Sequence, residues 1–187
     1  MFKPQISSLQ ECSYNIKTKN NTSVMKGDIL ITNGTSLNGF TGHTGIAVSS
    51  NEILHTANKN SVPEIISLNE WIETYGLEAP DEGFIPTNTE VYRLENINSS
   101  IFGVYAELAA DWARANYENS GYEYQITTDL FTTNPTYCSK IVWQAYYYAA
   151  GQWGPRFLDI PITNIPTPYG MPTYFKNGFE LELITII

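Results

Sequence analysis

Apolar and polar residues alternate in several short stretches of the chain, and this period-two pattern predicts β-strands. A further segment, PEIISLNEWIETYG (63–76), predicts a short strand and then a helical turn that starts at Ser67 or Asn69 and ends at Gly76. Strands are expected at 27–32, 43–50, 52–57, 89–95 and near 179–187, and the alternation is found at 43–50 and 89–95.

Two longer stretches place apolar residues three to four positions apart, which is the spacing of an amphipathic helix. Residues 99–118 form the first predicted helix. Residues 134–151 form the second, with Pro135 at its first helical position and Gly151 at its end. The apolar face expected for the first helix is Ile101, Val104, Tyr105, Leu108, Trp112 and Ala115. Strands first, then helices and a late strand predict an α+β fold with an antiparallel sheet.

The composition narrows the classes of function. The 187 residues suit a single domain, 1–187, and 42% hydrophobic residues suffice for a core. A formal net charge of −9 argues against binding to nucleic acid or anionic membrane, since both need a basic face. No stretch reaches the roughly 18–20 apolar residues that span a bilayer, so no stable membrane insertion is expected. The first residues lack the apolar core of a signal peptide, but a removed leader leaves no trace, so cytoplasmic and secreted locations both stay open.

Candidate chemistry centres on one cysteine and two histidines. Cys138 falls in the first turn of the second predicted helix, where partial positive charge and free amide donors favour a thiolate. It is therefore either poised for nucleophilic attack or simply packed. His43 and His55 are the chain's two histidines, and both lie in one predicted hairpin. A cysteine nucleophile needs a base, usually histidine, and a third group that fixes the tautomer of that base.

The register of the hairpin decides whether the two histidines meet. Side chains alternate along each strand, so His43 and His55 share a face only if paired positions sum to an even number. A three-residue turn at SSN (49–51) or a β-bulge achieves this. A strict two-residue turn at Ser50 and Asn51 places the two side chains on opposite faces.

Four short motifs resemble those of the circularly permuted papain-like cysteine enzymes of the NlpC type. The likeness is to the YiiX-like and YycO-like branch, which is related to lecithin:retinol acyltransferase, and it covers about residues 26–150. It implies an antiparallel sheet or partial barrel that bears the histidines, packs on helices and precedes a helix with the cysteine at its N-terminus. The motifs are GDIL (27–30), GHTGIAV (42–48), EILHTA (52–57) and YCSKIVWQAY (137–146).

The same resemblance implies a role for each candidate residue. Cys138 is implied as the nucleophile, His43 as the general base and then acid, and His55 as the residue that orients His43. Many bacterial members carry glutamate at the third position, whereas the acyltransferase branch carries histidine. Tyr122 or Tyr124, in GYEYQ, is implied as a donor to the oxyanion beside the backbone N–H of Cys138. The chemistry needs no metal or other cofactor.

The favoured function is a cysteine amidase or peptidase that cleaves a small amide or a cell-wall-type peptide through a thioester. An acyltransferase or thioesterase acting on lipid-like substrates is the main alternative, because His55 matches that branch. Two further alternatives are a Zn²⁺ site made by His43, His55 and Cys138, and a binding module without turnover. The expected partner is a small peptide, amide or acyl substrate, and the oligomeric state stays open.

Overall fold

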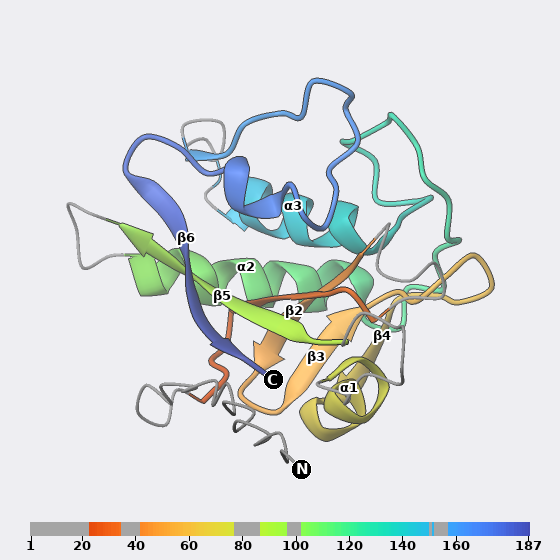
Figure 1. Ribbon diagram of the computed structural model, residues 1–187. Helices are drawn as coiled ribbons and strands as arrows, with labels where there is room; N and C mark the ends of the chain where they lie inside the picture. Colours follow the sequence, from red (N-terminus) through yellow and green to blue (C-terminus); the bar gives the residue numbers. More distant parts are fainter. Residues whose placement is uncertain (1–22, 35–41, 77–86, 97–101, 150, 152–156) are drawn as a thin grey trace, which may run out of the picture.

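One six-stranded sheet forms the centre of the molecule, and all its neighbouring strands run antiparallel in the order β4-β3-β2-β1-β5-β6 (Figure 1). The predicted α+β class with an antiparallel sheet is confirmed. The computed structural model describes residues 23–34, 42–76, 87–96, 102–149, 151 and 157–187. The strands are β1 (Ile29–Thr32), β2 (His43–Ser49), β3 (Glu52–His55), β4 (Glu64–Ser67), β5 (Thr89–Asn96) and β6 (Phe179–Ile186).

Helices cover both faces of the sheet (Figure 1). Ile46 and other residues of one face pack in a cluster with the two longer helices, whereas Ala47 and its neighbours pack on Trp71 from the short helix. Ser67 caps the short helix by accepting from the backbone N–H of Glu70, and Gly76 ends it, as predicted. The helices are α1 (Leu68–Tyr75), α2 (Phe102–Tyr117), α3 (Cys138–Ala149) and the 3₁₀ helix η2 (Met171–Thr173).

The buried face of α2 differs from the predicted one. Val104 and Leu108 are 53% and 43% exposed. The helix instead buries alanines on a face that lets it approach the neighbouring backbone closely: a Cβ on Gly27 would lie 2.5 Å from the main chain of Ala106. Of the predicted face, Val104, Leu108 and Ala115 are exposed, whereas Tyr105 and Trp112 are partly buried against the core, and Ile101 lies outside the described residues. The buried α2 residues are Ala106, Ala109, Ala110, Ala113 and Tyr117.

Helix α3 starts at Cys138 rather than at residue 134, so Pro135 precedes the helix instead of opening it. Thr136 forms an isolated bridge with Tyr124, which keeps this segment extended. The fully buried Lys140 then donates from Nζ to the carbonyl oxygen of Pro135 at 2.8 Å. The segment before the helix is therefore held against the first turn of α3 by a hydrogen bond from a buried cation.

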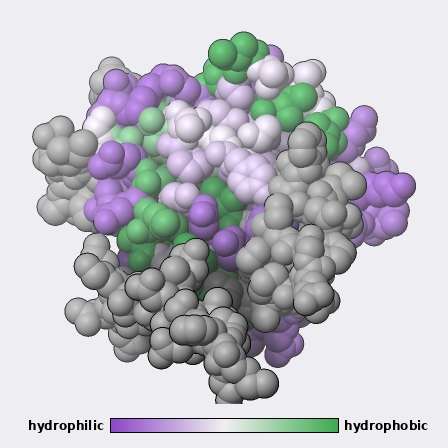
Figure 2. Space-filling view, in the orientation of Figure 1, coloured by the Kyte–Doolittle hydropathy of each residue, from purple (hydrophilic) through white to green (hydrophobic). Residues whose placement is uncertain are grey.

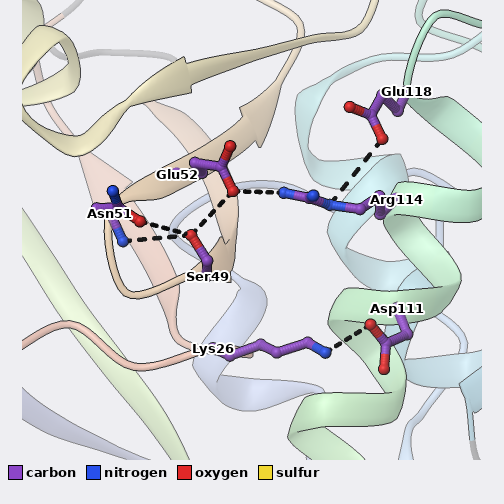
Figure 3. A network of polar contacts seen from close by, with 7 residues as sticks. All are labelled: Lys26, Ser49, Asn51, Glu52, Asp111, Arg114 and Glu118. Carbon is purple, nitrogen blue, oxygen red and sulfur yellow. Dashed lines mark hydrogen bonds and ion pairs between the residues drawn. The ribbon is translucent and has the colours of Figure 1, made fainter.

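A polar network joins the β2–β3 turn to α2 (Figure 3). The hydroxyl of Ser49 lies 3.0 Å from Glu52 Oε2, and the same carboxylate oxygen accepts from Arg114 Nη2 at 2.6 Å. One turn away, Lys26 and Asp111 form a second ion pair between the segment before β1 and α2. The contacts of Ser49 and Glu52 join the hairpin that carries both histidines to α2.

On the face shown in Figure 2, hydrophobic and hydrophilic residues are interspersed. Among the described residues, no helix is both long enough and apolar enough to cross a membrane. Several large apolar side chains are exposed in the chain on either side of α3, namely Ile126, Phe131, Ile160 and Ile162.

Candidate active site

The β2–β3 hairpin brings His43 and His55 together. Ile46 pairs with Leu54 and Ala47 with Ile53, so these paired positions both sum to an even number, 100. The turn itself has two residues, and a bulge between Ala47 and Ser49 restores the even register.

The contact between the two rings is direct. His43 Nε2 lies 2.9 Å from His55 Nδ1, and both residues are buried. The register condition that we derived from the sequence is therefore met through the bulge rather than through a three-residue turn.

Two aromatic residues of α1 enclose the histidine pair. The ring of Trp71 stacks on His43 with centroids 5.4 Å apart, and Tyr75 lies 5.1 Å from the same imidazole. Both rings also contact His55 edge-on. The sequence analysis missed them, although their i, i+4 spacing places them on one face of α1 and was a usable signal.

Burial keeps both histidines neutral at physiological pH. Desolvation, together with the charge of His55, lowers the pKa of His43 from 6.5 to about 3. Desolvation likewise lowers the pKa of His55 to about 4. In a pair of neutral imidazoles, the N–H of one ring donates a hydrogen bond to the unprotonated nitrogen of the other. If His43 donates from Nε2, its Nδ1 keeps a lone pair and is the nitrogen that can accept a proton from a thiol.

Cys138 is the first residue of α3, as the sequence placed it, and it is 7% exposed with a free thiol. The amides at the start of α3 act in the expected direction, but burial outweighs them, and the net effect raises the pKa of the Cys138 thiol. Backbone N–H groups of Thr44 and Ser139 oppose this shift by hydrogen bonding to sulfur. The N–H of Thr44 comes from β2, directly after His43, so the sulfur lies beside the strand end that carries the base.

One cavity of about 790 Å³ opens on both catalytic candidates, since Cys138 and His43 both line it. Tyr75, Tyr124 and Tyr137 add phenol groups to its wall. Much of the remaining wall is apolar. It comes mainly from the segment after α3, with Ile165, Pro166, Pro168 and Tyr169, and in part from Ile126 before α3.

A family model described as lipoprotein N-acylation protein LnsA-like matches residues 2–186. The chain belongs to this family. The family is related to papain-like enzymes, which agrees with the resemblance drawn from the motifs at that coarser level, although it does not single out the YiiX-like branch.

One curated relative, an uncharacterized 30.3 kDa protein of Bacillus thuringiensis, is 32% identical over 166 residues. The match covers 84% of this chain and 56% of that protein, so the chain spans little more than half the length of this relative. No solved structure matches the chain significantly.

The two tyrosines proposed as oxyanion donors have different surroundings in this LnsA-like protein. Tyr124 lines the cavity, and burial, with an added contribution from the neighbouring Cys138, raises its pKa to about 12, so it keeps its proton. Tyr122 packs against Tyr117 in the core, with ring centroids 5.9 Å apart. Tyr137 also lines the cavity, and its buried hydroxyl has no hydrogen-bond partner among the described residues.

The described residues do not offer the ligand cluster that the zinc alternative requires. Among the described residues, no group of three or more His, Cys, Asp or Glu side chains is arranged to hold a metal ion. The nitrogens of His43 and His55 that face each other form a hydrogen bond, so they cannot both point at one ion.

Proposed function

We propose that this protein is a cysteine acyltransferase that forms an acyl thioester on Cys138 and passes the acyl group to an amine. The observation that carries the proposal is the hydrogen-bonded pair of His43 and His55 beside the N-terminal cysteine of α3, with Cys138 and His43 on one cavity. The family description, which names lipoprotein N-acylation, supports transfer to an amine rather than peptide cleavage. The order of elements, with histidine strands before the cysteine helix, supports a permuted papain-like fold.

The first half-reaction transfers an acyl group from an ester to the enzyme. Because the thiol is protonated, His43 Nδ1 removes its proton as sulfur attacks the ester carbonyl. The hydroxyl of Tyr124 and the backbone N–H of Cys138 stabilise the oxyanion of the tetrahedral intermediate. The intermediate collapses by breaking the carbon–oxygen bond, and the imidazolium of His43 protonates the alcohol that leaves.

The second half-reaction transfers the acyl group from the thioester to an amine. The amine nitrogen attacks the thioester carbonyl, His43 takes the proton that nitrogen loses, and the same donors hold the second oxyanion. Collapse breaks the carbon–sulfur bond, and His43 returns the proton to the sulfur of Cys138. The products are an amide and the free enzyme. His43 gains and loses one proton in each half-reaction, so it ends the cycle in its starting protonation state.

The cavity wall supports an acyl substrate. Its apolar part is contributed by isoleucines and prolines, which suit a hydrocarbon chain. Hydrolysis, the function that the sequence analysis favoured, follows from the same thioester when water replaces the amine. The two reactions therefore differ only in the acceptor, and the products distinguish them.

The test uses the full chain, a fatty-acyl p-nitrophenyl ester as donor and a diacylated lipopeptide with a free α-amino group as acceptor. Intact mass spectrometry should show one acyl group on the wild type without acceptor, and none on Cys138→Ala. Adding the lipopeptide should discharge the adduct and give the N-acyl lipopeptide. Free fatty acid with no N-acyl product would favour a hydrolase, and an equal adduct on Cys138→Ala would exclude the nucleophile.

A further inference from the structure

His55 keeps one ring nitrogen without a hydrogen bond. Its Nδ1 faces His43, but its Nε2 is buried and has no hydrogen-bond partner among the described residues. His55 as a whole is 3% exposed, so bulk water does not solvate this nitrogen. If this buried nitrogen carries a proton, leaving its N–H without a hydrogen-bond acceptor costs free energy.

A carboxylate stands opposite this nitrogen. His55 of β3 and Glu64 of β4 are directly paired in the sheet register, so their side chains project from the same face. Glu64 Oε1 lies 3.9 Å from His55 Nε2, and the Glu64 side chain is 51% exposed. That separation is about 1 Å longer than a hydrogen bond, a gap that a rotation of the exposed side chain or one bridging water closes.

The other groups that face His55 do not compete for this role. His43 already occupies Nδ1, Trp71 presents a ring, and Tyr75 contacts the imidazole edge-on. Among the described residues, Glu64 is the acidic group paired with this ring.

We propose that Glu64 is a positioning residue of the active site, whose carboxylate accepts the Nε2 proton of His55. The role assigned to His43 in this inference depends on the proposed function. With the proton of His55 on Nε2, its Nδ1 accepts from His43 Nε2. The proton of His43 is then on Nε2, and Nδ1 keeps the lone pair that Cys138 needs.

The opposite tautomer is inactive, and this is why the carboxylate matters. If His55 carries its proton on Nδ1, it donates to His43 Nε2, and His43 must hold its own proton on Nδ1. His43 Nδ1 then has no free lone pair and cannot act as the base. Glu64 selects the productive tautomer of both rings, and its negative charge also stabilises the imidazolium that forms on His43 during each attack.

The experiment compares Glu64→Ala with Glu73→Ala, a control that removes another exposed carboxylate, from α1. Nitrogen-15 NMR of the imidazoles reads the tautomer directly and does not depend on activity. Wild type and Glu73→Ala should show His55 protonated on Nε2, whereas Glu64→Ala should show a mixture. Glu64→Gln, whose amide oxygen can still accept the proton, should restore the tautomer.

The kinetic readout then tests the consequence for chemistry. Replacing the residue that fixes a catalytic histidine's tautomer can lower kcat by about 10⁴-fold, and a residue acting through a second histidine should cost about 10- to 100-fold. We expect that loss in kcat with KM unchanged for Glu64→Ala, and a smaller loss for Glu64→Gln. An unchanged His55 tautomer in Glu64→Ala overturns the inference. An altered tautomer in a protein without acyltransfer would contradict only the proposed function.

Discussion

The buried histidine pair makes the stability of the protein depend on pH in a range where few other groups titrate. In the folded state the pKa values of His43 and His55 are lowered from 6.5 to about 3 and about 4. The unfolded chain therefore binds more protons than the folded one as the pH falls below 6.5. By linkage, stability is fully present above this value and is lost progressively as the pH falls toward the folded pKa values.

The size of the effect follows from the two pKa values. Between pH 7.5 and pH 5 an unfolded histidine becomes almost fully protonated while a folded one in this pair stays neutral. Each histidine then lowers the free energy of unfolding by about 2 kcal/mol, so the pair lowers it by about 4 kcal/mol. A domain with a total stability of about 5–15 kcal/mol loses a large fraction of it.

Urea unfolding at pH 7.5 and at pH 5, followed by tryptophan fluorescence, measures this difference. The chain has two histidines, so single replacements dissect the effect. His55→Gln should keep about half of the pH dependence of the wild type, because His43 stays buried beside Trp71. A wild-type loss below about 1 kcal/mol, or an undiminished loss in both single His→Gln variants, would refute the assignment of neutral buried rings.

Two further predictions concern the oxyanion donor and the ion pair between Arg93 of β5 and Asp28, which directly precedes β1. Tyr124→Phe should lower kcat for acyl transfer by about 10-fold or more, because one donor to the oxyanion is lost, whereas Tyr122→Phe should leave kcat near wild type. Arg93→Gln should lower the free energy of unfolding in urea by about 3 kcal/mol, because it leaves the buried carboxylate of Asp28 without its bidentate partner. An Arg93→Gln loss below 1 kcal/mol would contradict that reasoning.

The elements that the sequence predicted best are those with a strong local pattern. Alternation located the central strands, and the capping residue and the glycine located α1. The buried face of α2 could not be predicted from hydrophobicity alone. Its contacts need small residues, and only the three-dimensional approach of Gly27 to Ala106 shows that alanine is required there.

The candidate site could be predicted in part for a similar reason. Residue chemistry identified Cys138 and the histidine pair, and the register argument stated the condition for their contact. Trp71 and Glu64 lay outside that reasoning, because each is placed beside the histidines by long-range packing or strand pairing. The sign of the Cys138 pKa shift was missed because it depends on burial, which a helix position does not reveal.

The bulge in the β2–β3 hairpin has a consequence for reading relatives of this chain. The two histidines are twelve residues apart, and with a two-residue turn an even spacing places them on one face only when one strand holds an extra residue. In a relative with the same two-residue turn but an odd number of positions between the two histidines, a regular hairpin without a bulge would place both side chains on one face. Single-residue insertions or deletions between the histidines are therefore expected to occur only with gain or loss of the bulge, so segment length is as informative as residue identity.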